Sequence, residues 1–551
     1  MTYGTKKHTP PAILVKESEF RSATEKYITY VLVIIGFAVV AAFAWWWFTK
    51  EHIPQNFTGR WHMLDMALFA TLSYVVWYQV VNEMMSWEIA LWMRKPRYMS
   101  PEEGLRVALL TAFVPGKEPY DVLENTLTKM VAVEYPHDTW LLDEGDDREA
   151  KRICEKLGVL HYSRHGKEHF NTLDGKFKRK TKAGNYNSWF HNFSGNYDIV
   201  AQHDVDFAPT PQYLMRTLGY FRDPHVAFVG TPQIYGNIDE SWIAKGAAEQ
   251  AYGFYGSMQK GLFGHDMHLF IGANHIIRIA AHDDIGGYAG HIVEDHLTGM
   301  RLYRNNWKGV YVAEELLVGE GPATWAAYFS QQMRWAYGLI DILFRHSPRL
   351  MPRMRLRHSF HYLLLQQYYF YGLAQMLGIF LLFLYFTLGV NATRMQLQEL
   401  LTYYPSFLLM QILIFLWLQR FYVNQKVESG LHLRGKLLNI AAGPIYFLAF
   451  IGALTGRRLT YEVTPKGAAQ SENIPPSPGL FIWHGVWGTV TAFGILVGVY
   501  AGHAAPQLVF WAVLNTLCMY YFLASAMTQN VLQRMSRTNF SRGNFLKKHA
   551  I

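Results

Sequence analysis

The sequence predicts an α/β domain, with a mixed central sheet and flanking helices, inserted between transmembrane α-helices. Uncharged apolar runs on both sides of the chain's centre reach or approach the roughly 20 residues that a membrane-spanning helix needs. The segment 100–338 instead mixes charged residues, glycines and apolar residues, as a water-exposed α/β domain does. For 551 residues we therefore expect several domains and not one soluble core.

The apolar runs predict about six spans in three hairpins. The uncharged stretches that supply one span each are 27–49, 66–82, 362–393 and 402–419. Residues 476–533 are uncharged too and are long enough for two spans, with a turn near Gly502. This even count places both chain ends and the α/β segment on one side of the membrane.

One further apolar run, 437–456, would make the count odd. It contains Gly443-Pro444, which weakens a spanning helix, and basic residues bracket it closely. We interpret it as a helix at the cytoplasmic interface of the membrane. The alternative is a seventh span, which would put the polar strip 461–467 outside the cell.

The formal charge of +9 does not indicate nucleic-acid binding. Basic residues cluster before the first apolar run and after the last one, which is the bias of cytoplasmic flanks. We therefore expect a multi-pass membrane protein with a cytoplasmic α/β domain, cytoplasmic termini and no nucleic-acid partner. Since no organellar targeting signal is apparent, we expect the bacterial inner membrane. The polar N-terminus and the missing small-residue cleavage site argue against a signal peptide.

Cysteines and histidines show no soft-metal spacing. Cys154 and Cys518 fall in a soluble and a spanning segment, so neither a disulfide nor a cysteine metal site is expected. The 23 histidines contain no zinc motif, and we interpret His265 and His268 as surface or packing residues.

The α/β segment opens as a βαβ unit with acids at its strand ends. Residues 105–115 predict a strand, 123–135 a helix, and 138–147 a second strand that ends in Asp143 and Glu144. Ligands are expected at the carboxyl ends of such strands. No GxGxxG or GxxxxGK(S/T) follows a strand, which argues against dinucleotide and Walker-type sites.

A further strand, within 198–207, ends in Asp204 and Asp206. Carboxylates two residues apart can point the same way, and paired oxygen ligands suit Mg²⁺ or Mn²⁺ bound to a diphosphate. A solvated turn is the alternative for an isolated pair of this kind.

Asp295 follows a glycine-rich loop and precedes a helical pattern. It could cap that helix or act as a general base on an acceptor hydroxyl. Downstream, Gln331 can share one helix face with Arg334 and Trp335, at i+3 and i+4. A guanidinium for phosphate beside an aromatic plane for a sugar ring favours the general-base interpretation.

Taken in order, these motifs resemble those of the processive family 2 glycosyltransferases of the cellulose synthase type, which have a GT-A fold. Lys182 opens KAGNYN, similar to the family's K-A-G-x-x-N segment, and Gly272 and Ala273 lie in FIGANH, similar to its acceptor-side loop. The usual TED is VED here, which keeps the acid. The positions matching the family's D, DxD, TED and Q(Q/R)xRW motifs are Asp143 with Glu144, Asp204 and Asp206, Asp295, and Gln331 with Arg334 and Trp335.

The resemblance also explains the polar strip 461–467 (YEVTPKG), which is similar to the F-x-V-T-x-K-G gating loop of cellulose synthases. It implies that Thr464 and Lys466 contact the diphosphate from a lid over a cytoplasmic site. Such a lid supports the six-span topology, because the strip must then lie on the cytoplasmic side.

On the donor side, the resemblance implies a nucleotide-sugar site with a metal. Asp143 would contact the uracil or ribose, with Glu144 beside it, and Lys182 would help to hold the nucleotide. Asp204 and Asp206 would bind the diphosphate and Mg²⁺ or Mn²⁺, with Asp206 as the direct ligand.

On the acceptor side, the resemblance implies that Asp295 deprotonates the attacking hydroxyl and that the anomeric carbon inverts. Arg334 would steady the departing diphosphate, and Trp335 would stack under the acceptor sugar. Gln331, Gly272 and Ala273 would line the acceptor site.

These expectations divide the chain into seven parts. They are a cytoplasmic tail (1–26), a transmembrane hairpin (27–85), a GT-A catalytic domain with interfacial helices (86–345), a second hairpin (346–425), an interfacial helix with the gating loop (426–475), a third hairpin (476–530) and a basic tail (531–551). The chain ends about twenty residues after the last span, so regulation by cyclic-di-GMP would require another subunit.

The resulting hypothesis is a synthase that polymerises a UDP-sugar, UDP-glucose foremost, into a β-glucan and exports it, with β-1,4, β-1,3 and mixed linkages all open. Its partners would be the donor, the growing polysaccharide, the bilayer and accessory export subunits. The alternatives are a non-processive transferase with a lipid acceptor, a synthase that uses another UDP- or GDP-sugar, and a catalytically inactive partner or export pore.

Overall fold

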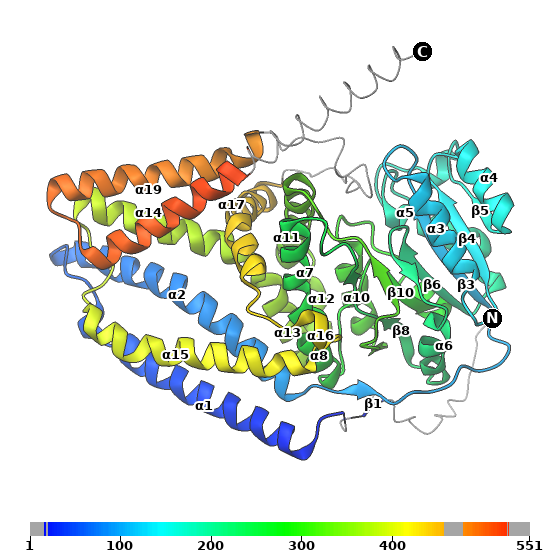
Figure 1. Cartoon of the computed structure of the whole chain (residues 1–551), viewed down its shortest axis with the longest axis horizontal. Helices are drawn as coiled ribbons and strands as arrows, with labels where there is room; N and C mark the ends of the chain where they lie inside the picture. The colour runs from blue at the N-terminus through cyan, green and yellow to red at the C-terminus, as the bar shows by residue number, and fades with distance from the viewer. Residues whose placement is uncertain (1–15, 18–19, 457–477, 526, 528–551) are drawn as a thin grey trace, which may run out of the picture.

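The computed structural model describes residues 16–17, 20–456, 478–525 and 527 of the chain. Long apolar helices form one side of the molecule and an α/β domain forms the other (Figure 1). This arrangement confirms the predicted fold class, because the α/β domain comes between the second and third apolar helices along the chain.

The central sheet has seven strands and is mixed. β10 pairs antiparallel with β6 and β8, and the other neighbouring pairs are parallel. In spatial order the strands are β11 (Lys308–Tyr311), β8 (Val226–Gly230), β10 (Asn274–Arg278), β6 (Ile199–Asp204), β3 (Val107–Phe113), β4 (Asp138–Asp143) and β5 (Leu160–Tyr162).

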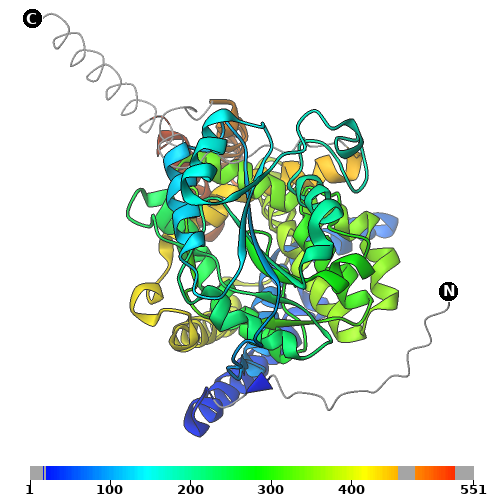
Figure 2. The same cartoon turned by 90° about the vertical axis from the view of Figure 1, so that its right-hand side faces the viewer.

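Helices cover both faces of this sheet, as the view onto the α/β domain shows (Figure 2). One face packs against α3 (Tyr120–Val131) and α4 (Arg148–Leu157). The other face packs against α5 (Lys182–Phe193) and α10 (Glu294–Arg304). Because both faces are covered, β3 reads as a nearly continuous buried run instead of an alternating pattern.

The helix predicted over 123–135 begins three residues earlier and ends four residues earlier, at Tyr120 and Val131. It starts directly after Pro119, whose missing N–H costs nothing at a helix N-terminus. After the helix the chain turns, and the amide of Glu134 donates to the carbonyl of Pro211, 3.0 Å away. A non-local hydrogen bond therefore ends the helical pattern.

Seven helices among the described residues are long and apolar enough to cross a membrane, judged by length and composition. The first, α1 (Ala23–Trp47), begins four residues before the predicted run because Ser22 and Glu25 form a capping box. The others are Gly59–Leu91, Leu356–Leu388, Leu397–Phe421, Leu433–Thr455, Gly479–Ala501 and Pro506–Ser525.

The long helices do not all pack with their sequence neighbours. α15 (Leu397–Leu418) packs against α1, whereas α14 (Tyr371–Leu388) packs against α2 (His62–Leu91) and α19 (Ile482–Ala501). Figure 1 shows α14 and α15 on opposite sides of α2. The two long helices of the second predicted hairpin, α14 and α15, therefore pack on other helices and not on each other.

The helix α17 (Leu433–Thr455) contains the run that would make the span count odd. Half of its most apolar window is buried, against 17–33% in the other six helices. It packs on α7 (Trp242–Gly253) and α11 (Trp325–Arg345) as well as on α14. Figure 1 shows α17 between the apolar helices and the α/β domain, running across the direction of the long helices.

Candidate active site

The acids predicted at strand ends lie at one edge of the sheet. β3 separates β4 from β6, and its last residues pair with the two acids, Phe113 with Asp143 and Ala112 with Asp204. The carboxyl ends of these parallel strands therefore bring Asp143 and Asp204 to the same side of the domain.

Asp143 is fully buried and orders the loop that follows its strand. Its oxygens accept hydrogen bonds from the amides of Gly145 at 2.9 Å and Asp147 at 2.5 Å. Nε2 of His161 lies 3.1 Å from Oδ2 of Asp143. All of these partners are protein groups, so Asp143 shapes the loop 144–147 at the sheet edge.

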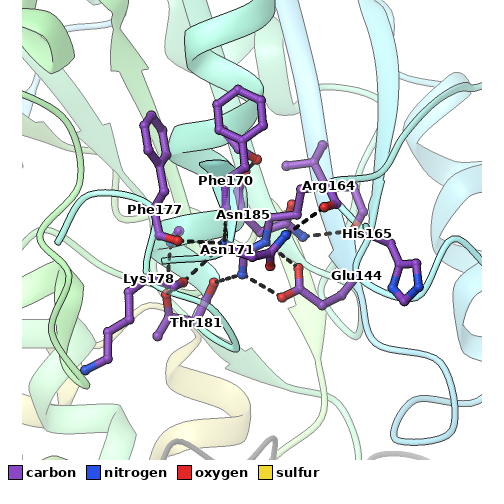
Figure 3. Close-up of polar contacts among 12 residues, drawn as sticks. Glu144, Arg164, His165, Phe170, Asn171, Phe177, Lys178, Thr181 and Asn185 are labelled. Atoms are coloured by element: carbon purple, nitrogen blue, oxygen red, sulfur yellow. Dashed lines mark hydrogen bonds and ion pairs between the residues drawn. The ribbon is translucent and has the colours of Figure 1, made fainter. Parts of the chain in front are cut away.

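Glu144 is held by Arg164, which is fully buried (Figure 3). The pair is bidentate, with Nε to Oε2 at 2.9 Å and Nη2 to Oε1 at 2.6 Å. The same guanidinium donates to the carbonyls of Phe170, Lys178 and Thr181. Arg164 thus ties the acidic strand end to the loop that leads into α5.

Lys182 is the first residue of α5, and Thr181 caps this helix by accepting from the amide of Gly184. Nζ of Lys182 donates to Oδ1 of Asp204 and to the carbonyl of Gly272, both at 2.5 Å. Burial disfavours the charged lysine, but Asp204, Tyr186 and Glu294 together outweigh this and raise the pKa of Lys182.

The two carboxylates of the DxD pair have different surroundings. The side chain of Asp204 is 34% exposed and contributes to the wall of the main cavity. Asp206 is only 5% exposed. Both supply hard oxygen donors at the end of β6, which is the chemistry that Mg²⁺ and Mn²⁺ prefer.

The predicted acceptor loop connects the acidic groups of the site. The amide of Gly272 donates to Oδ2 of Asp295 at 2.9 Å, and the carbonyl of Ala273 accepts from the amide of Asp204 at 2.9 Å. A Cβ at Gly272 would lie 2.8 Å from Oδ2 of Asp295, so only glycine allows this close approach.

Asp295 lies in the first turn of α10, beside Glu294. Its Oδ1 accepts from the amide of His296 at 2.8 Å. Burial raises the pKa of Asp295 above its ordinary value, and the hydrogen bonds from His296 and Gly272 oppose that shift. Burial and the charge of Asp295 raise the pKa of Glu294 to about 7.

A cavity of about 630 Å³ connects these groups with the apolar helices. Gln331, Arg334 and Trp335 of α11 line it, as the predicted helix face requires. Its wall also contains Lys182, Asp204, Gly272, Ala273, Glu294 and Asp295 from the α/β domain, and Glu83, Trp87, Ile414 and Phe415 from α2 and α15.

Two predicted site residues, Thr464 and Lys466, lie outside the described residues. Two other residues enter the site that sequence reasoning did not select. Glu294 could have been found from its place in the VED motif, since it lines the cavity beside Asp295. Arg164 stands in no motif, and only the tertiary structure shows that it holds Glu144.

Comparison with known proteins identifies the type of domain. Residues 199–418 match the family described as "Glycosyl transferase family group 2". A cellulose synthase catalytic subunit (UDP-forming) from Xanthomonas axonopodis pv. citri is 25% identical over 372 residues, which are 65% of this chain and 48% of that protein. The chain thus contains a domain of the family 2 glycosyltransferases and is similar to cellulose synthase catalytic subunits.

A second relative of this transferase is the cellulose synthase 1 catalytic subunit (UDP-forming) of Komagataeibacter xylinus. It is 27% identical over 309 residues, which are 54% of this chain and 39% of that protein. The transferase thus aligns with less than half the length of either relative.

Among solved structures, a mannosyltransferase from Pyrobaculum calidifontis in complex with GDP-Man and Mn²⁺ is similar at 13% identity and a TM-score of 0.46. That similarity covers 71% of this transferase and all of the other chain.

Proposed function

We propose that this transferase polymerises glucose from UDP-glucose into a β-glucan and passes the product across the bacterial inner membrane. The observation that carries this proposal is the continuous cavity, which joins an acidic strand edge, a carboxylate with a raised pKa and the apolar helices. The relatives named as UDP-forming cellulose synthases support glucose and UDP as the sugar and the leaving group.

In this proposal the strand edge binds the donor. Asp204 and Asp206 would hold Mg²⁺ or Mn²⁺ on the diphosphate, and such a metal neutralises the charge that develops on the leaving nucleotide. Lys182 would move from Asp204 toward a phosphate oxygen when the donor enters, because it stands within hydrogen-bond distance of that carboxylate. Asp143 and Glu144 would shape the nucleotide pocket, and Thr464 and Lys466 would close it.

The carboxylate of Asp295 would take the proton from the acceptor hydroxyl. The hydroxyl oxygen then bonds to the anomeric carbon while the bond from that carbon to the diphosphate oxygen breaks, and the configuration inverts. Arg334 would stabilise the charge on the diphosphate. Trp335 would support the sugar ring, with Gln331, Gly272 and Ala273 around it.

Six apolar helices would then span the membrane, and α17 would lie at its cytoplasmic face. The greater burial of α17 and its packing on α7 and α11 support this topology. The catalytic domain and both termini would be cytoplasmic, and the polymer would leave between α2 and α15, whose residues Glu83 and Phe415 line the cavity. Accessory subunits could extend this path.

The test is polymer synthesis by the purified protein in nanodiscs. Each common UDP-sugar, and GDP-mannose, is supplied with Mg²⁺ or Mn²⁺, and nucleotide release is followed together with high-molecular-weight product. We expect polymer from UDP-glucose alone, sensitive to a β-glucanase that identifies the linkage. A single-sugar lipid product would overturn the proposal in favour of a lipid transferase. Polymer from another donor would show that the sugar of that donor, and not glucose, is polymerised.

A further inference from the structure

A second cluster of potential ligands lies where the apolar helices join the α/β domain. Glu88 belongs to the last turn of α2, His265 follows α8 (Gln259–Gly264) and His361 belongs to α13 (Leu356–Gln366). One ligand atom from each of the three lies within 4.8 Å of the others. Nε2 of His265 is 3.0 Å from Oε1 of Glu88, and Nε2 of His361 is 3.5 Å from Oε2.

The hydrogen bonding of His361 directs the lone pair of one ring nitrogen toward the carboxylate of Glu88. Its Nδ1 lies 2.7 Å from the carbonyl oxygen of Arg357, and a carbonyl only accepts, so Nδ1 carries a proton. In the neutral ring, Nε2 then presents a lone pair toward the carboxylate of Glu88. Two acceptors facing each other are stabilised by a proton between them, on the ring or on the carboxyl group, or by a metal ion.

Several features favour a metal ion. A ring that donates Nδ1–H to a backbone carbonyl and points Nε2 at a carboxylate has the usual orientation of a metal-bound histidine. The nearby guanidinium of Arg357 is already paired with Asp266. The side chains of His265 and His361 are 10% and 5% exposed, whereas Glu88 is 37% exposed, which leaves access for a water ligand.

We propose that Glu88, His265 and His361 bind a divalent transition metal of the zinc class, with water in the fourth position. Two imidazole nitrogens and one carboxylate suit Zn²⁺, whereas the oxygen donors of Asp204 and Asp206 suit Mg²⁺ or Mn²⁺. The metal would fasten α2 to α8 and α13. It would do so next to the cavity, since the neighbouring Trp87 lines the cavity wall.

This site has no sequence signature because its ligands come from three distant segments. Our interpretation of His265 and His268 as surface or packing residues applies to His268, which is buried with its ring 4.6 Å from that of Phe228. A similar group, His291 with Asp341 and His346, does not support a metal, because Arg345 already neutralises Asp341.

The test uses the full-length protein in detergent with a tag that contains no histidine. The protein is stripped with a chelator, incubated with Zn²⁺, dialysed without nucleotide and analysed for zinc by mass spectrometry. We expect about one zinc per chain for the wild type and a more than tenfold weaker affinity for His361→Gln and Glu88→Gln. His225→Gln, which also removes a histidine paired with a carboxylate, is the matched control and should keep the zinc.

Asp206→Asn is the second control, and it should keep the zinc because this site is separate from the donor site. Loss of zinc with Asp206→Asn, or equal zinc in wild type and His361→Gln, would overturn the proposal.

A measurement on the wild type alone covers the case in which a variant misfolds. Co²⁺ in place of zinc should give the intense visible bands of a four-coordinate nitrogen and oxygen site, and zinc should remove them. If His361 is instead an imidazolium paired with Glu88, no such bands appear and thermal stability does not respond to zinc or chelator. Either result would overturn the metal proposal.

Discussion

The acidic side chains on the two sides of the cavity have different kinds of partner. On the strand-edge side, two of the acids have a cationic partner, Asp204 with Lys182 and Glu144 with Arg164. On the helix side, Glu294 and Asp295 stand next to each other, and the hydrogen bonds to the carboxylate of Asp295 come from backbone amides. On the helix side, burial raises the pKa of both Glu294 and Asp295.

This difference matches two kinds of ligand. A nucleotide diphosphate and its metal can take over charged partners that already form ion pairs in the free protein. Charged side chains can therefore be present at the strand edge before the donor binds. An acceptor hydroxyl is neutral and gives up a proton, and a base with a raised pKa suits that step better than an ordinary carboxylate. Substitutions on the two sides should therefore fail in different ways.

The largest effect is expected for Asp295→Asn. The side-chain amide of Asn keeps one acceptor oxygen, so it can keep only one of the two hydrogen bonds from Gly272 and His296, and it cannot take a proton. We therefore expect kcat to fall by about 10²–10⁴-fold with little change in the KM of the donor. Single-turnover assays of nucleotide release would measure this. Asp174→Asn, whose side chain is 69% exposed, is the surface control. Retained activity would remove Asp295 from the role of base.

Asp206→Asn should weaken metal binding at the strand edge and thereby lower activity. We expect activity to fall by about 100-fold or more and the Mn²⁺ concentration for half activity to rise, because one hard oxygen ligand is lost. Titrating Mn²⁺ against the activity of the wild type and of the variant would measure this change. An unchanged metal requirement would show that Asp206 is not a ligand.

Arg164→Ala tests the structure behind the strand edge. Removing one partner of this buried pair leaves Glu144 uncompensated, which should lower the free energy of unfolding by about 3–5 kcal/mol. Thermal unfolding in detergent would show a lower Tm. The double variant Arg164→Leu with Glu144→Leu removes both charges and should recover part of the loss. If it recovers nothing, the carbonyl contacts of Arg164 matter more than the ion pair.

Trp335→Ala should affect the binding of the acceptor and not that of the donor. Loss of the aromatic plane is expected to raise the KM for a soluble oligosaccharide acceptor by about tenfold and to leave the KM for the donor nearly unchanged. Steady-state kinetics with each substrate varied in turn would show this. A rise in the donor KM alone would show that Trp335 contributes to the donor site and not to the acceptor site.

The smallest effect is a shift in pH dependence for Glu294→Gln. Because the base must be ionised, activity should fall as the pH drops, with an acid limb above the ordinary aspartate value of 3.8. Replacing Glu294 removes a neighbouring negative charge, so the limb should move to lower pH. Profiles of kcat/KM would measure it. An unmoved limb would show that Glu294 and Asp295 titrate independently.

Local sequence patterns determined the class of fold and the chemistry at the strand ends. The buried run of β3, the acids after β4 and β6, and the shared helix face of Gln331, Arg334 and Trp335 are all visible along the chain. They could be predicted because periodicity and strand-end position depend on neighbouring residues. For the same reason, the apolar runs indicated which helices suit a membrane.

Only the tertiary structure decided which charges meet. Lys182 lies 90 residues from Gly272 and 22 from Asp204, yet it bonds to both, because β6 and β10 are adjacent in the sheet although 69 residues of chain separate them. The placement of α14 and α15 on opposite sides of α2, and the meeting of Glu88, His265 and His361, have the same origin. Strand order and helix packing set these contacts, and one sequence read along its length contains no local pattern that records them.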